Sequence, residues 1–446
     1  MKARKKSDNQ GQLLGGDLLE HLNPQNPLML LNRKIPWEFL EKELAPLYGE
    51  GGRPAKPIRL MCGLLILKQL ENLSDEHLIE QWVQNPYFQA FCGEHTFQWR
   101  APCASSDLSH FRKRIGEAGV EKIFQVSVTL HGARALEKEV LIDTTVQEKN
   151  ITFPTDSKLL AKIVSWCWKI GKEFEIQWRR SYKREMKIVI RTINFSRGIK
   201  NAKQVGKARR RLRTIAGVLF RELKRKLSTT ALKTFADKLE IFGKVLSQRK
   251  NDKNKIYSLH EPGTLCIAKG KSHKKYEFGS KVCFVTGKNK GVVLGAKNFE
   301  QNLYDGDTVE ETVRQMERIL NYKPELGIAD KGFRGRKKIL GVNILTPANQ
   351  GHKLSESDKR GNRKRNKRRS AIEPVIGHLK SDFRMARNFL RGTLGDAINA
   401  LMAAAAFNFK KWMRKARLGF LFSFLRCLVA SVINAQNIRG RNISFQ

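Results

Sequence analysis

The pattern that most limits the fold is a set of short strand-like runs, rich in apolar and β-branched residues, that alternate with helical segments. These runs occupy residues 139–156, 264–271, 276–287, 290–298, 325–330 and 342–347. The first, EVLIDTTVQEKNITFPTD, is bounded by turn residues and predicts two strands that form a hairpin. Strands followed by helices are typical of an α/β core, so the sequence predicts a mixed sheet with flanking helices.

Helical periodicity surrounds and interrupts these runs. Residues 55–135 have apolar side chains at helical spacing, with Ser74 and Ser106 as N-cap residues, and predict an all-helical domain over residues 1–135. Residues 157–250 are helical and strongly basic, which indicates an insertion after the first hairpin. The remaining α/β domain then spans 136–416, and 417–446 form a helical tail.

Further helices are expected later in the chain. Residues 307–320 predict a helix capped by Asp307 or Thr308, and residues 335–341 a short helix. A basic run follows, and helical spacing returns from about residue 370. The apolar segment 418–432 is shorter than the ~20 residues needed to span a bilayer, so it predicts a packing or partner-binding helix and no membrane partner.

Charge points to a polyanionic partner. The chain has 446 residues, 85 Lys and Arg against 42 Asp and Glu, and a formal net charge of +43. A protein with this many cations can displace counterions from phosphates, so we expect a nucleic acid as its partner. The alternatives are an inert basic surface and binding to an anionic membrane. Seven scattered cysteines without a Cys-x-x-Cys pair, and a basic amino terminus without an apolar signal stretch, favour reduced thiols in the cytoplasm.

Three acids could hold a divalent metal. Asp143 follows the apolar run Val-Leu-Ile, and Asp330 ends Leu-Gly-Ile-Ala-Asp just before Lys331-Gly332. An unpaired carboxylate at the end of a buried strand is costly, and carboxylate oxygens are ligands that Mg²⁺ prefers. Each aspartate could instead form a turn through its side chain.

Glu373 is the third acid and follows the basic run. Ser370-Ala371-Ile372-Glu373 fits a capping box, in which the glutamate would only cap a helix. If the helix extends back far enough, Arg369 and Lys380 share a face with Glu373, so the carboxylate could bind metal while the cations hold phosphates. A salt-bridge ladder explains the same spacing.

Taken together, these motifs resemble the DDE transposases of bacterial insertion sequences, most closely the "insertion sequence five" group. The resemblance rests on IDTTVQEKNITFPTDSKLL around Asp143, GIADKGFRG around Asp330, and Arg369-x3-Glu373-x6-Lys380. The segment from RPAKPIRLMCGLL to DLSHFRKRIG is similar to the amino-terminal domain of that group. Asn366 stands where the group often has tyrosine.

The resemblance implies a ribonuclease-H-like fold, with Asp143 on the first strand, Asp330 after the fourth strand and Glu373 on a helix beside them. It implies that these acids are catalytic and bind two Mg²⁺ ions, with Mn²⁺ as a substitute. The activity would be cleavage of double-stranded DNA at the element's ends and transfer of the 3′-hydroxyl into target DNA. A non-catalytic nucleic-acid-binding protein and a metal-dependent nuclease that cuts without joining remain alternatives.

The same resemblance assigns DNA contacts and partners. Arg369 and Lys380 would hold phosphates beside the scissile bond, and a loop from His352 to Arg369 would approach the DNA. The expected contacts in the helical domain and in this loop are Arg112, Lys113, Arg114, Arg363, Lys364, Arg365, Lys367 and Arg368. A homodimer on DNA and a nucleoid-associated protein of the bacterial cytoplasm are expected.

Overall fold

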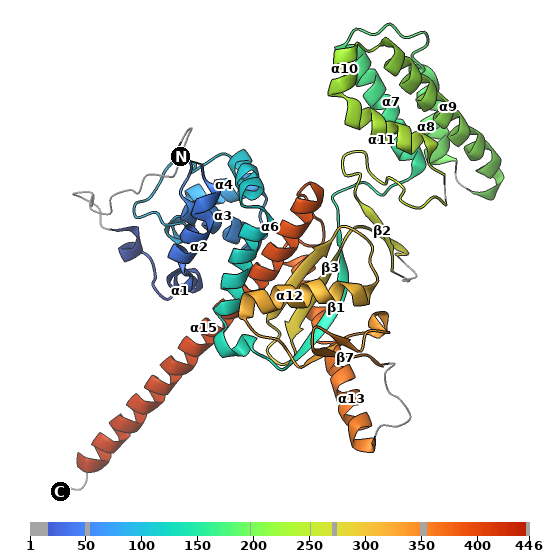
Figure 1. The fold of residues 1–446 in the computed structure, drawn as a ribbon. Coiled ribbons are helices and arrows are strands. Elements are labelled where there is room, and N and C mark those ends of the chain that lie inside the picture. The colour runs from blue at the N-terminus through green and yellow to red at the C-terminus, as the bar shows by residue number, and fades with distance from the viewer. Residues whose placement is uncertain are drawn as a thin grey trace. The chain divides into compact units, whose positions relative to one another are not determined.

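The fold is described from a computed structural model that covers residues 17–49, 54–196, 198–249, 251–269, 274–347 and 355–442 (Figure 1). The side chains of Ile199 and of residues 418–442 lie outside the description. The chain divides into two compact units, which are described separately. Unit 1 comprises Met1–Glu148 and Ser280–Gln446, and unit 2 comprises Lys149–Gly279.

Unit 1 begins with helices, as the apolar spacing predicts. They are η1 Leu18–His21, α1 Pro27–Lys34, α2 Trp37–Leu44, η2 Ala45–Leu47, α3 Ile58–Leu70, α4 Asp75–Gln84, α5 Pro86–Phe91, α6 Ser105–Thr129 and η3 Gly132–Ala135. Ser74 caps α4 by accepting the His77 N–H at 3.1 Å, so that prediction is confirmed. The prediction for Ser106 is wrong, because the N-cap residue of α6 is Ala104, two residues earlier, and the Asp107 carboxylate accepts the Ala104 N–H at 3.0 Å.

A mixed sheet forms the other half of unit 1, and the predicted α/β class is confirmed. Its strands are β1 Glu139–Glu148, β3 Tyr276–Gly287 from Ser280 onward, β4 Val293–Phe299, β5 Leu326–Ile328, β6 Lys338–Ile339 and β7 Val342–Leu345. The order along the sheet is β3-β1-β5-β7-β6, and β4 also pairs with β3. β1, β5 and β7 run parallel, whereas β3 with β4 and β6 with β7 are antiparallel.

Two local predictions within the α/β region are wrong. Residues 139–156 form no hairpin, because β1 is one continuous strand. Just beyond its end, the Lys149 N–H donates to the carbonyl oxygen of Phe278 in β3 at 2.9 Å. Residues 335–341 form no helix: β6 turns through Leu340 and Gly341, both with positive φ, into β7. Two residues with positive φ are what a tight hairpin turn requires.

The remaining helices of unit 1 follow β4 in the chain and alternate with the last strands. They are η5 Asp305–Thr308, α12 Val309–Leu320, η6 Lys331–Phe333, α13 Glu356–Arg369, α14 Ile372–Ser381 and α15 Gly392–Asn442. The predicted helix 307–320 is confirmed with Thr308 as its N-cap residue, although the Thr308 hydroxyl donates to Asp305 O.

Helix α15 packs against α6 and β4 (Figure 1), and its residues Ala403–Ala406 are buried. The buried Asn408 amide accepts the Val293 N–H at 2.9 Å and donates to Val293 O at 2.8 Å. These two bonds satisfy polar groups that would be costly to bury unpaired.

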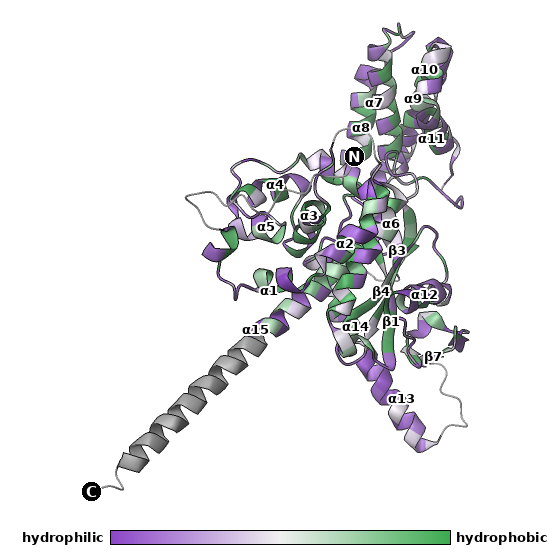
Figure 2. Ribbon diagram, turned by 60° about the vertical axis from the view of Figure 1, so that its left-hand side comes forward, coloured by the Kyte–Doolittle hydropathy of each residue, from purple (hydrophilic) through white to green (hydrophobic). Residues whose placement is uncertain are grey.

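Unit 2 is built mainly from helices. It contains α7 Asp156–Glu173, α8 Lys183–Phe195, η4 Ile199–Asn201, α9 Ala202–Lys226, α10 Thr229–Thr234, α11 Ala236–Ser247 and the strand β2 Leu265–Ala268. Fully buried leucines and isoleucine line one face of α9, namely Leu212, Ile215, Leu219 and Leu223. Figure 2 shows hydrophilic residues along the other parts of this helix. The predicted basic helical segment is therefore helical.

No helix in the described part of the chain is both long enough and apolar enough to cross a membrane. The apolar segment 418–432 falls within α15, and its side chains lie outside the described residues, so its packing stays a prediction.

Candidate active site

Three elements that carry the candidate acids pack on one another. Leu141 of β1, Ile328 of β5 and Ile372 of α14 are all at most 1% exposed and form one hydrophobic cluster. Successive strand residues face opposite sides, so Asp143 shares the face of Leu141, on which α14 packs. Asp330 lies two residues beyond Ile328 in extended backbone, and Glu373 directly follows Ile372. The cluster therefore draws the three acid-bearing segments together.

The acids themselves have different surroundings. Asp143 is half-buried and accepts the N–H of the next residue, Thr144, at 2.8 Å. Asp330 is half-buried and accepts the Gly332 N–H at 2.7 Å, which is the turn-forming role that its sequence position also allowed. Glu373 is exposed, and its carboxylate lies 3.6 Å from the Arg369 guanidinium.

The capping-box interpretation of Glu373 is wrong. Helix α13 ends at Arg369 and α14 starts at Ile372, so the two helices are separate and Ala371 is the N-cap residue. The Ser370 hydroxyl donates back to Lys367 O at 2.9 Å, at the end of α13. Arg369 still reaches Glu373 across the break, as the salt-bridge interpretation predicted. Lys380 is half-buried in the last turn of α14.

The donor chemistry of the three acids suits a hard divalent cation, which takes oxygen ligands. Their side chains are not closed into a metal-binding cluster. Among the described residues, no group of three His, Cys, Asp or Glu side chains comes close enough to hold a metal ion. The three carboxylates fit such an ion by chemical type and by the packing of their elements.

The basic run upstream of Glu373 is a helix, so the prediction of a loop over its described part is wrong; residues 352–354 lie outside the described residues. Ser355 caps α13 by accepting the Asp358 N–H at 3.1 Å. None of the residues of α13 is buried. Figure 2 shows that most residues along this helix are hydrophilic. A helix that is polar all round gains little from packing, so its charges determine what it contacts.

The cations of α13 divide between two faces. Arg365 pairs with Glu139 at 3.2 Å, Arg369 pairs with Glu373, and Arg368 donates to Lys288 O at 3.2 Å. Four other cations are exposed at spacings of three, four and seven residues, which places them on one face: Arg360, Arg363, Lys364 and Lys367. We call these four the outer stripe. The outer stripe presents four positive charges to solvent.

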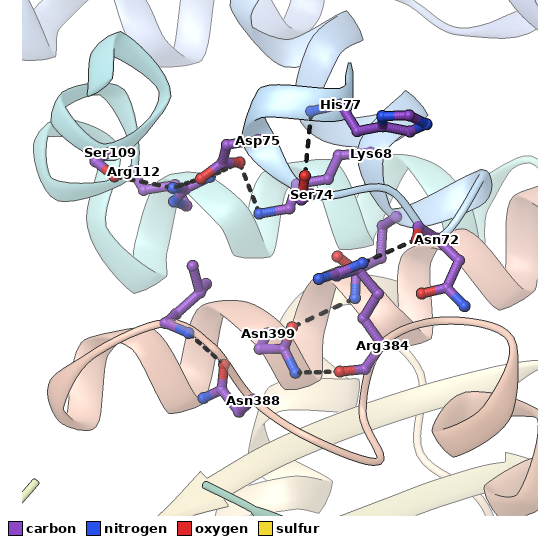
Figure 3. A network of polar contacts seen from close by, with 12 residues as sticks. Lys68, Asn72, Ser74, Asp75, His77, Ser109, Arg112, Arg384, Asn388 and Asn399 are labelled. Carbon is purple, nitrogen blue, oxygen red and sulfur yellow. Dashed lines mark hydrogen bonds and ion pairs between the residues drawn. The ribbon is translucent and has the colours of Figure 1, made fainter. Parts of the chain in front are cut away.

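Arg112, predicted to contact DNA, is instead part of the interior. Its side chain is 7% exposed and donates to both carboxylate oxygens of Asp75, at 3.0 and 2.6 Å (Figure 3). Lys68 donates to the same carboxylate at 2.7 Å. Burial lowers the pKa of Lys68 to about 8. Burial alone would raise the pKa of Asp75, but Arg112 and Lys68 lower it.

The two other predicted cations of α6 are accessible. Lys113 and Arg114 are exposed, and the Arg114 guanidinium lies 4.6 Å from the centre of the Tyr48 ring. Of the three consecutive cations 112–114, Lys113 and Arg114 can therefore reach a partner, whereas Arg112 is bound to Asp75.

A polar network joins the amino-terminal helices to the acid-bearing elements (Figure 3). Asn399 of α15 donates to Arg384 O at 3.2 Å and to Gln147 Oε1 of β1 at 2.7 Å. Arg384 in turn donates to Asn72 O at 2.8 Å. Gln69 of α3 donates to Phe383 O at 2.6 Å. This network fixes α3 to the chain that follows α14 and to the end of β1.

Sequence reasoning missed a further acid at this edge of the sheet. Asp305 accepts a hydrogen bond from the Thr144 hydroxyl and one from the Lys281 ammonium, both at 2.9 Å. Its only sequence signal is an acid just before a predicted helix, which is also the signal of an ordinary cap.

Comparisons with known proteins match two regions. Residues 16–114 match the family model described as "Transposase domain (DUF772)", and residues 248–409 match "Transposase DDE domain". The second match includes Asp330 and Glu373, and Asp143 lies outside both. The "Uncharacterized protein ORF8 in nfe locus" of Rhizobium meliloti is 40% identical over 190 residues, which are 41% of this chain and 91% of that protein. No solved structure gives a significant match.

Proposed function

The chain belongs to the insertion-sequence DDE transposases, and on that premise we propose that it cuts DNA at the ends of its element and joins the exposed 3′-hydroxyl to target DNA. The observation that carries the proposal is the cluster of Leu141, Ile328 and Ile372, which packs together the three segments that bear acids. Phosphodiester transfer needs charged oxygens to be neutralised and a nucleophile to be held in line, and convergent carboxylates with metal ions supply both.

Enzymes of this family use divalent metal ions. We assign Asp143, Asp330 and Glu373 as the catalytic residues and the ligands, for two Mg²⁺ ions with Mn²⁺ as a substitute. When bound, such ions would activate a water or hydroxyl group and stabilise charge on the phosphate. The Arg369 guanidinium lies beside the Glu373 carboxylate. In this proposal Arg369 and Lys380 bind the phosphates that flank the scissile bond.

The proposed fold of the catalytic region, residues 136–416, is ribonuclease-H-like with the helical insertion at about 157–250. The parallel pair of β1 and β5 supports it, because Asp143 lies on one strand and Asp330 follows the carboxyl end of its neighbour. Ligands of open α/β sheets bind at such carboxyl ends. Residues 1–135 are proposed as an amino-terminal helical DNA-binding domain, with Lys113 and Arg114 as contacts, and 417–446 as a tail.

The outer stripe of α13 is proposed as the main backbone contact beside the catalytic acids. Its four exposed cations, Arg360, Arg363, Lys364 and Lys367, suit the spacing and charge of duplex phosphates, whereas Arg365 is already paired with Glu139. A homodimer would hold the two element ends together. The expected setting is the nucleoid of a bacterial cytoplasm.

A strand-transfer assay tests this function. Labelled element ends are incubated with the purified chain, a supercoiled plasmid and Mg²⁺, and the expected product is label joined to plasmid. Nicking without joining under Mg²⁺ and Mn²⁺ would favour a nuclease. The control is D330N, which should bind the ends normally and give no product. No product from the wild type under either metal, with unchanged binding of the ends by D330N, would favour a non-catalytic DNA-binding protein, and normal product from D330N would remove Asp330 from the catalytic set.

A further inference from the structure

Asp305 lies in the single 3-10 turn that precedes α12, and it belongs to none of the motifs that point to the active site. One carboxylate oxygen, Oδ1, accepts the Thr144 hydroxyl and the Lys281 ammonium, each at 2.9 Å. The Lys281 side chain is 10% exposed and also donates to Leu303 O at 2.5 Å. The Lys281 side chain is therefore largely removed from solvent, and charges interact more strongly away from water than in it.

The other oxygen of Asp305 faces the turn that holds Asp330. A Cβ atom added to Gly332 would lie 2.8 Å from Asp305 Oδ2 and 2.9 Å from Asp330 Oδ1. Both contacts are closer than real Cβ atoms make, so any side chain here would push the two carboxylates apart. Glycine at position 332 thus lets two carboxylates approach the same point.

Asp305 is linked to Asp143 as well. Thr144, which donates to Asp305, is the residue that follows Asp143 in β1. The charges of both acids also act on the buried thiol of Cys283. Burial raises the pKa of this thiol to about 11, and the negative charges of Asp143 and Asp305 add to the rise. Charges from the two carboxylates therefore reach a common part of the interior.

We propose that Asp305 is a positioning residue that sets the divalent-cation affinity of the edge formed by Asp143 and Asp330. It acts through Thr144 on one side and across Gly332 on the other, and it adds negative potential without touching the substrate. Lys281 opposes it by neutralising part of that charge. The inference rests on the proposed function only in taking Asp143 and Asp330 as cation ligands.

The test is direct measurement of Mn²⁺ binding to the full chain by isothermal titration calorimetry, without DNA. D305N keeps the shape and an oxygen that can accept from Thr144 and Lys281, but it removes the charge. We expect its Kd for Mn²⁺ to rise about tenfold. K281Q should change the Kd in the opposite direction, because it removes a competing positive charge while keeping a donor.

The matched control is D307N. Asp307 is two residues away, undergoes the same change of charge and pairs with the exposed Arg336. Equal Mn²⁺ affinity in D305N, D307N and the wild type would overturn the inference, as would a D305N variant that only lowers the melting temperature. D330N separates this failure from failure of the proposed function: if D330N also leaves Mn²⁺ binding unchanged, the assignment of Asp330 as a metal ligand fails instead.

Discussion

Two cationic stretches look alike in sequence and behave differently in the structure. Residues 112–114 of α6 are all arginine or lysine, and so are residues 363–369 of α13 apart from Asn366. Both stretches predict contacts to phosphates. Arg112 is nevertheless buried against Asp75, whereas α13 has no buried residue among its fourteen. A run of cations therefore shows which part of the chain is positively charged. Whether each of its side chains is buried or exposed depends on acidic residues elsewhere in the sequence.

The spacing within α6 could have identified Arg112. Leu108, Phe111 and Ile115 are buried on this helix, and Arg112 falls between them at the same helical period. A cation on an apolar face needs a buried acid, because an unpaired buried charge is costly. Asp75 supplies it from α4, and local sequence reasoning does not reach that far.

The largest effect is expected at Arg112. Replacing Arg112 with Met removes the main partner of Asp75 inside the protein, so the free energy of unfolding in urea should fall by about 3–5 kcal/mol. Lys113→Gln is the neighbouring control and should change it by no more than about 0.5 kcal/mol, because Lys113 is exposed. If the R112M protein kept its stability and bound DNA more weakly, Arg112 would be a phosphate contact and its assignment to the interior would be wrong.

The outer stripe should affect DNA binding and leave stability unchanged. For the triple variant R363Q/K364Q/K367Q, we expect the slope of log K against log salt to become shallower by about 3. Titrations of labelled duplex DNA at several salt concentrations measure it. R365Q is the control, because Arg365 lies outside the outer stripe and is paired with Glu139. Its salt slope should be nearly that of the wild type. Equal losses of slope per charge in both variants would contradict the division of α13 into two faces.

Lys68 gives the buried region a pH dependence that exposed cations lack. Burial lowers its pKa to about 8 in the folded chain, against the ordinary value of 10.5. Between these values the unfolded chain binds more protons, so stability rises with pH over this window, and the gain is lost as pH falls from 10.5 to 8. Relative to K68M, the wild type should gain on the order of 2 kcal/mol from pH 8 to 10.5. A constant difference between the two proteins over that range would rule this out.

The smallest effects concern one serine near each stretch. Ser74 accepts the His77 N–H and caps α4, so Ser74→Ala should cost about 1 kcal/mol of unfolding free energy. Ser370 caps no helix and donates to Lys367 O, so Ser370→Ala should cost less than about 0.5 kcal/mol. Thermal unfolding of both variants compares them. A larger loss in the Ser370 variant would revive the capping box before Glu373.

Much of the fold could be predicted because its signals are local. Strand runs, the helix at 307–320 and the cap at Ser74 each depend on a few adjacent residues. The hairpin at 139–156 was mispredicted because β1 finds its partners in β3 and β5, which are more than a hundred residues away. The helical state of α13 was missed because its like charges read as a solvated loop.

The site divides in the same way. The family resemblance is confirmed by the transposase matches, and the three acids came from motifs that occupy a few positions each. Asp305 could not be found from sequence, because its role arises from Thr144, Lys281 and Gly332, which belong to three separate segments. Contacts of that kind become visible only in three dimensions.

The central claim is that Asp143, Asp330 and Glu373 act as one catalytic set. Its most direct test is the rate of end cleavage in D143N, D330N, E373Q and the three double variants, at equal occupancy of labelled DNA. If the acids work as a unit, each single substitution should lower the rate about a thousandfold or more, and the doubles should lower it no further. Normal cleavage by any single variant, or losses that multiply in the doubles, would contradict the account.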